Sequence, residues 1–60
     1  ANPVAMFLAT AMMLVYLNEV ESARRLQQAV NECIANLETT PDLGGSLTIK
    51  EVTEKVIQRL

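Results

Sequence analysis

The sequence predicts an all-α chain of three helices. Two observations carry this prediction: long apolar stretches run unbroken or recur at helical spacing, and one segment, residues 39–47, holds both glycines and one of the two prolines. We therefore expect helices over about 3–18, 19–38 and 48–60, with a glycine loop at 39–47. Sixty residues, half of them apolar, form one small unit, and we expect no complete independent domain.

The first predicted helix begins at a proline-containing cap. Asn2 is expected to cap it, with Pro3 at the first helical position. Every residue of 4–17 except Thr10 is apolar, and its alanines, methionines and leucines favour helix over strand. The stretch is too short for a membrane span of about 20 residues, and no basic segment precedes it as in a signal peptide. We expect a buried core helix, with Phe7 and the methionines as ordinary core, and no membrane partner.

The second predicted helix is amphipathic. Asn18 ends the apolar run and is expected to cap this helix, with Glu19 and Glu21 in its first turn. Glu21 and Arg25 stand at i,i+4 in the favourable order for an ion pair. The expected buried stripe comprises Val20, Ala23, Leu26, Val30, Cys33, Ile34 and Leu37. Because Cys33 lies on this stripe, we expect an inert, packed thiol and a reducing compartment.

The third predicted helix carries the strongest start signal in the chain. Thr48 and Glu51 have the spacing of a capping box, and Leu47 and Val52 that of a hydrophobic staple. Its expected buried stripe comprises Ile49, Val52, Val56 and Leu60. In the preceding loop the paired glycines match neither G-x-G-x-x-G nor G-K-[ST], so a glycine turn between helices is favoured over a phosphate site. Asp42 either caps a turn of this loop or meets a ligand.

The composition excludes several classes of function within this chain. Five basic and seven acidic residues give a net charge of −2, which lacks the basic surface of a nucleic-acid binder. With no histidine and a single cysteine, the chain holds no catalytic triad, no Cys/His zinc site and no disulfide framework. We expect no nucleic-acid partner.

The first helix needs more cover than the other two supply. It is apolar nearly all round, and two amphipathic helices cover about two of its sides, so we expect an exposed apolar patch. The sequence thus predicts a segment of a larger fold, or a subunit with an obligatory partner. The competing hypothesis is a self-contained three-helix interaction module that dimerises through its first helix.

Three blocks of sequence resemble a known family. Residues 1–5 (ANPVA), 11–14 (AMML) and 40–45 (TPDLGG), at this separation, resemble the C-terminal stretch of the isocitrate and 3-isopropylmalate dehydrogenase family. The resemblance covers essentially all 60 residues. It implies a C-terminal helical segment of the large domain of an α/β fold, packed against a sheet that comes mainly from earlier parts of the parent chain.

The resemblance also implies an activity for the parent protein. That activity is an NAD-linked oxidative decarboxylation of a 2-hydroxy acid, assisted by Mg²⁺ or Mn²⁺. The favoured substrate is isocitrate, which would be converted to 2-oxoglutarate. The family's metal ligands and catalytic residues all precede this segment, so the chain itself holds none of them and is expected to be inert alone. The parent is expected to be an oligomer in the cytoplasm or the mitochondrial matrix. A 3-isopropylmalate or related substrate and a non-catalytic regulatory subunit remain alternatives.

The resemblance implies a cofactor-binding role for three residues of this chain. Asn2 would contact the adenine of the dinucleotide, assisted by main-chain groups of Ala1, and Asp42 would lie close to the adenosine. NADP-specific bacterial isocitrate enzymes carry a tyrosine before that aspartate and an arginine three residues after it. This chain has Pro41 and Gly45 there, which favours NAD.

Two further features bear on the type of family member. The compact join over residues 15–19 resembles isocitrate enzymes more than isopropylmalate enzymes. Val15 and Tyr16 replace a basic pair or Arg-His that is common in the family, and residues 47–49 are more apolar than the usual threonine-rich run. These departures are what a divergent or non-catalytic subunit would show.

Overall fold

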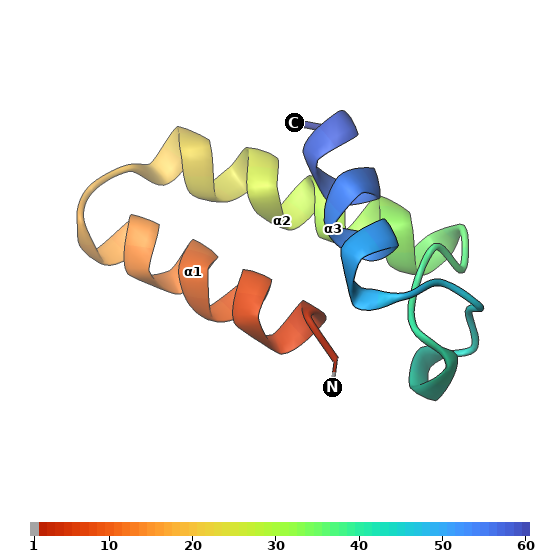
Figure 1. The fold of residues 1–60 in the computed structure, drawn as a ribbon. Coiled ribbons are helices and arrows are strands. Elements are labelled where there is room, and N and C mark those ends of the chain that lie inside the picture. Colours follow the sequence, from red (N-terminus) through yellow and green to blue (C-terminus); the bar gives the residue numbers. More distant parts are fainter. Residues whose placement is uncertain (1) are drawn as a thin grey trace.

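A computed structural model describes residues 2–60 and contains three α-helices. They are α1 (Val4–Tyr16), α2 (Val20–Ala35) and α3 (Ile49–Gln58), with a short 3-10 helix, η1 (Pro41–Leu43), between α2 and α3. Helices α1 and α2 are antiparallel neighbours, and α3 crosses α2 near its carboxyl end (Figure 1). No strand occurs within residues 2–60, so the all-α prediction is confirmed.

The start of α1 lies one residue later than predicted, since the first residue of the helix is Val4 and its N-cap position is Pro3, but the side chain of Asn2 still bonds to the first turn. The Oδ1 atom of Asn2 accepts a hydrogen bond from the Val4 amide at 2.9 Å. Pro3 has helical backbone angles, and its carbonyl accepts from the Phe7 amide at 3.1 Å. Asn2 therefore satisfies one of the amides that the first turn leaves without a helical partner, and Pro3 occupies the position where its missing N–H does no harm.

The junction of α1 and α2 differs from the prediction. Asn18 has φ 65°, in the left-handed region, where asparagine is one of the few tolerated residues. Its amide donates to Val15 and the Glu19 amide donates to Leu14 at 2.7 Å, the paired hydrogen bonds of a Schellman motif. Asn18 thus ends α1 and does not cap α2, whose N-cap is Glu19 without a side-chain cap bond.

Helix α2 ends in the same way and earlier than the predicted residue 38. Leu37 has φ 55°, while the Glu38 amide donates to the Cys33 carbonyl at 2.8 Å. A leucine at this left-handed position is strained, because its Cβ crowds the backbone. The turn nevertheless directs the chain away from α2 into the loop that carries Asp42.

The core lies where α3 crosses α2. Its fully buried members are Ala29, Val30, Cys33, Val52 and Val56. Partly buried side chains from the rest of the chain surround it: Val4, Phe7, Leu8, Leu26 and Leu47. The predicted burial of the Cys33 thiol is confirmed. Ala29 is not part of the predicted stripe but belongs to this buried core.

The predicted stripes of α2 and α3 extend beyond this core. Their outer members are exposed: Val20, Ile34, Leu37, Ile49 and Leu60. These side chains lie at helix ends or beside the crossing, where no other described element covers them. The ion pair of α2 also differs, since Glu21 pairs with Arg24 one turn on and not with Arg25. Both arginines were within reach by spacing alone.

Helix α1 exposes most of its apolar surface. Only Ala11 is buried, whereas Met12 is 74% and Tyr16 is 88% exposed. The predicted burial of α1 is therefore not reached within the described chain, because only one side of α1 lies on α2, and its burial in a larger fold stays a prediction. The predicted exposed patch is present instead.

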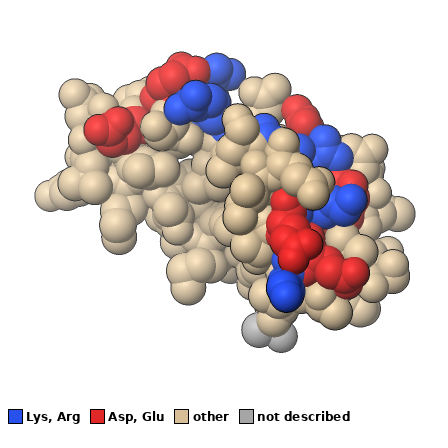
Figure 2. All heavy atoms as spheres, turned by 45° about the horizontal axis from the view of Figure 1, so that its top comes forward, with Lys and Arg blue, Asp and Glu red and all other residues tan. Residues whose placement is uncertain are grey.

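Charged side chains gather over α2 and α3, which leaves a wide uncharged surface (Figure 2). Among residues 2–60 no helix has the length and apolar character to cross a membrane.

Candidate functional site

The amino ends of α1 and α3 meet beside the loop that follows α2. Figure 1 shows the start of α1 next to the start of α3. The space between them is an open groove of about 670 Å³, within the size range of ligand sites. It is lined by Asn2, Thr40, Pro41, Asp42, Ser46, Leu47, Thr48 and Ile49. Asn2 and Asp42, two of the three predicted site residues, thus line one groove, while Ala1 lies outside the described residues.

Asn2 is held by the cap of α1. Because its Oδ1 atom is bonded to the Val4 amide, the carboxamide has a defined orientation. Its two Nδ2 hydrogens are donors that the cap does not use. The side chain can therefore serve the helix with its oxygen and a ligand with its nitrogen.

Asp42 is held by the neighbouring threonine. The Thr40 hydroxyl donates to Oδ1 of Asp42, and this bond, followed by smaller effects that include the Asn2 amide, lowers the pKa of the Asp42 carboxyl. Asp42 is exposed, whereas Thr40 is only 6% exposed. The groove consequently presents a carboxylate that is ionised at neutral pH.

The loop backbone is organised by two buried threonines, Thr39 and Thr40, that are not among the predicted site residues. The Thr39 carbonyl accepts from the Leu47 amide at 3.0 Å, and the Thr40 carbonyl accepts from the Gly45 amide at 3.2 Å. Gly44 has φ 88°, which favours glycine. A threonine directly before a proline, with an aspartate two residues on, is a turn pattern that could have pointed to Thr40.

The third wall of the groove is the capped start of α3. The Glu51 amide donates to Oγ1 of Thr48 at 3.2 Å, and the Thr48 amide donates to the Glu51 carboxylate at 2.8 Å. The predicted capping box is therefore confirmed. The backbone hydrogen bond from Thr48, followed by its side-chain bond, lowers the pKa of Glu51.

The chemistry of the groove suits a neutral, polar ligand. Asp42 is the only ionisable side chain among the lining residues, and no lysine or arginine lines the groove. One carboxamide, one carboxylate and several hydroxyls stand beside the apolar side chains of Leu47 and Ile49. Such a surface can accept hydrogen bonds from ligand hydroxyls, donate to a heteroaromatic edge, and repel an added phosphate.

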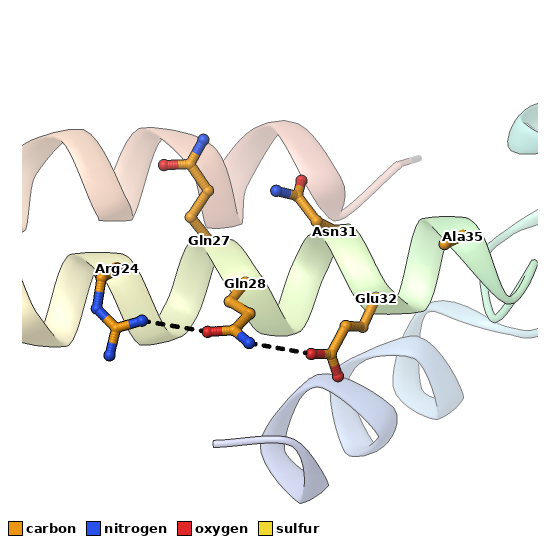
Figure 3. Close-up of a pocket in the computed structure, with 6 residues that line it drawn as sticks. All are labelled: Arg24, Gln27, Gln28, Asn31, Glu32 and Ala35. Carbon is orange, nitrogen blue, oxygen red and sulfur yellow. Dashed lines mark hydrogen bonds between the residues drawn. The ribbon is translucent and has the colours of Figure 1, made fainter.

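A second hollow, of about 370 Å³, lies along the outer side of α2. Figure 3 shows Gln28 bonded to both Arg24 and Glu32, with Gln27 and Asn31 on the adjoining row. All of its lining residues come from one helix, and three of them are bonded to one another, so it offers no second wall for a ligand. Within residues 2–60 no three acidic or cysteine side chains are grouped as metal ligands. The groove beside the loop is the candidate site.

Comparisons with known proteins agree with the predicted family. The family model described as isocitrate/isopropylmalate dehydrogenase matches residues 1–57. An isocitrate/homoisocitrate dehydrogenase of Thermus thermophilus is 47% identical over 60 residues, which are 100% of this chain and 18% of that protein. A 3-isopropylmalate/3-methylmalate dehydrogenase of Methanocaldococcus jannaschii is 45% identical with the same coverage of both chains.

A plant protein is similarly close. The mitochondrial regulatory subunit 1 of an NAD isocitrate dehydrogenase of Arabidopsis thaliana is 48% identical over 61 residues, which are 100% of this chain and 17% of that subunit. The chain thus spans less than a fifth of the relatives it matches. No solved structure matches it. Since the family model covers nearly the whole chain, this protein belongs to the isocitrate/isopropylmalate dehydrogenase family.

Proposed function

We propose that the full-length protein is an NAD-linked dehydrogenase that oxidatively decarboxylates a 2-hydroxy acid, with isocitrate as the favoured substrate. Residues 1–60 would supply part of its adenosine pocket and several core helices. The observation that carries this proposal is the meeting of Asn2 and Asp42 in one groove. The ligands for Mg²⁺ or Mn²⁺ and the catalytic groups are assigned to other parts of the protein.

Asn2 and Asp42 would hold the adenosine half of the dinucleotide. The amide group of Asn2, whose nitrogen the helix cap does not use, suits the edge of an adenine, and the carboxylate of Asp42 suits a ribose hydroxyl. Leu47 and Ile49 would give the base an apolar surface. When bound, NAD supplies a hydride acceptor at its nicotinamide ring, remote from these contacts.

The loop supports a preference for NAD over NADP. No cation lines the groove, and the Asp42 carboxylate would repel a 2′-phosphate. At Gly45, where NADP-specific relatives are expected to carry arginine, an added Cβ would lie 2.1 Å from the Thr39 carbonyl oxygen. This loop conformation therefore excludes any side chain at position 45, arginine included.

The exposed side of α1 supports the role as core helices. Its large apolar side chains, Met6, Met12 and Met13 among them, are more than half exposed within the described chain. Burying such a surface contributes about 25 cal/mol per Å². We assign this cover to the remainder of the parent chain, and an obligatory partner subunit is the alternative.

Two alternatives for the parent rest on specific observations. The T. thermophilus and M. jannaschii relatives bear the names of different 2-hydroxy-acid enzymes, so 3-isopropylmalate or homoisocitrate is the second substrate choice. The Arabidopsis relative is named as a regulatory subunit, and Val15 and Tyr16 replace the basic residues common in the family. A non-catalytic regulatory subunit is therefore the second functional choice.

The test is an assay of the full-length protein with Mg²⁺, NAD or NADP, and isocitrate, homoisocitrate or 3-isopropylmalate in turn. We expect reduced nicotinamide to form with NAD and isocitrate, at a kcat/KM well above that with NADP. Equal use of NADP would contradict the assignment of the loop. No turnover with any of the acids, together with stimulation of a catalytic partner subunit, would replace the enzyme by the regulatory alternative.

A further inference from the structure

The Thr40 side chain stands apart from the other polar groups of the groove because it is almost fully buried. Its hydroxyl donates to Oδ1 of Asp42, and its carbonyl accepts from the amides of Leu43 at 3.0 Å and Gly45 at 3.2 Å. Pro41 follows directly and restricts the backbone of Thr40 to an extended conformation, which the structure shows with ψ 163°. The hydroxyl and the carbonyl of Thr40 are thus both bonded within this loop.

We propose that Thr40 is a positioning residue for dinucleotide binding: its hydroxyl holds one oxygen of the Asp42 carboxylate and so orients the carboxylate toward the ribose of NAD. This inference rests on the proposed function of the groove. It adds a residue that would act through Asp42 and would not itself meet the ligand.

The physical argument is one of preorganisation. An exposed aspartate on a short loop samples several rotamers, and fixing one of them on binding reduces affinity. The hydroxyl–carboxylate bond of Thr40 fixes that rotamer beforehand, and hydrogen bonds to a charged acceptor are the strong ones. Thr40 can do this because it is β-branched, buried and held at its carbonyl. The same bond is the largest cause of the lowered pKa of the Asp42 carboxyl, which shows that it favours the charged form.

A purely structural role for Thr40 makes a different prediction. If the hydroxyl only closed the turn, its loss would loosen the loop without regard to Asp42. The two roles are separated by a double-mutant cycle in the full-length protein with Thr40→Val, which keeps the shape and removes the donor, and Asp42→Ala, which removes the acceptor. Thr40→Ser keeps the donor and serves as the conservative variant. Thr10→Val is a matched control, because it removes a hydroxyl bonded to the Met6 carbonyl on α1, away from the groove.

Two measurements are made on each variant. The first is NAD binding by calorimetry together with KM and kcat, where we expect Thr40→Val to weaken NAD binding about 2- to 10-fold, with a larger effect on KM than on kcat. In the Asp42→Ala background the same change should have little further effect. The second is a carbon-13 NMR titration of the Asp42 carboxyl without ligand, where Thr40→Val should raise its pKa and Thr40→Ser should not.

The outcomes separate this inference from the proposed function. If the wild-type protein does not bind NAD, both are overturned. If Asp42→Ala weakens NAD binding while Thr40→Val binds as the wild type does, only the role of Thr40 is overturned. An equal effect of Thr40→Val with and without Asp42, or an unmoved Asp42 pKa, would likewise make Thr40 a structural residue only.

Discussion

The carbonyl oxygen of Thr39 lies 2.1 Å from the point where a Cβ atom would stand on Gly45. Real Cβ atoms essentially never approach another atom within 3.0 Å. Thr39 is fully buried, and its carbonyl oxygen accepts a hydrogen bond from the Leu47 amide at 3.0 Å. The Thr39 carbonyl is therefore held in place and does not move away from position 45 without breaking this bond. The loop that carries Asp42 therefore closes on itself only with glycine at position 45.

This contact predicts that Gly45→Ala destabilises the protein more than Gly44→Ala does. Gly44 has φ 88°, but an added Cβ there would only touch the Leu37 side chain at 3.5 Å, an ordinary contact, so alanine costs about 1–2 kcal/mol of backbone strain. At Gly45 the added methyl meets buried backbone, and the loop must shift. Denaturant unfolding of the two full-length variants compares them directly. A smaller loss for Gly45→Ala would show that the Thr39 contact gives way easily.

The capping box predicts a selective effect at Thr48. Thr48→Ala removes the acceptor of the Glu51 amide and should lower the free energy of unfolding by about 1 kcal/mol. Thr48→Ser keeps that oxygen and should stay close to the wild type. Denaturant midpoints of the three full-length proteins provide the comparison. Equal losses in the alanine and serine variants would mean that the threonine methyl, and not the cap, matters.

The lowered pKa of Glu51 predicts a dependence on acid. Because the folded pKa lies below the ordinary value of 4.5, ionised Glu51 adds stability above that value. This contribution is lost as the pH falls through the folded pKa. The stability difference between the wild type and Glu51→Gln should therefore shrink on acidification from neutral pH. Glu54→Gln, at an exposed position of the same helix, is the control. A difference that stays constant with pH would contradict the role of the charge.

Sequence reasoning predicted best what is local. The capping box of α3 needs only two residues that lie three apart, and it is as expected. The cap of α1 needs only its first few residues: the Asn2 side chain bonds to the first turn as expected, although the helix begins one residue later than predicted. Asn18 was misassigned because asparagine suits both an N-cap and a left-handed helix end, and the sequence pattern at a short junction fits either. Which of the two roles Asn18 takes depends on how α2 turns back onto α1.

The remaining differences arise from tertiary structure. The apolar pattern of α1 describes what the helix can bury, whereas its actual exposure depends on elements beyond α2 and α3. Thr39 and Thr40 were passed over because polar loop residues are usually exposed. The identities of Asn2 and Asp42 as site residues came from resemblance, and only the folded arrangement places them in one groove.

The exposed side of α1 predicts the behaviour of the 60 residues in isolation. Met12, Met13 and Tyr16 are more than 60% exposed, so a monomer would present an apolar surface that favours association. We expect no dehydrogenase activity and no cooperative thermal transition at monomer mass. Circular dichroism combined with sedimentation tests this. A sharp two-state melt of a monomer would support the self-contained module.

The double use of Asn2 predicts that its two roles can be separated. Asn2→Ala in the full-length protein removes both the cap and the amide donors, so it should lower stability by about 1 kcal/mol and weaken NAD binding. One or two neutral hydrogen bonds correspond to roughly a 2- to 100-fold rise in KM. Turnover should change little, because a contact to adenine is equally strong in the ground and transition states.

Asn2→Asp and Asn2→Ser then isolate the donor role. Both keep an oxygen that can accept the Val4 amide, and an acid is favourable at a helix start, so both should melt as the wild type does. Both lose the amide donors, and the aspartate also adds a negative charge near Asp42. We therefore expect weaker NAD binding in both, with the larger loss in Asn2→Asp. Thermal melts and NAD titrations on the same samples measure the two effects. If both variants bind NAD as tightly as the wild type, Asn2 is a helix cap and does not read the adenine.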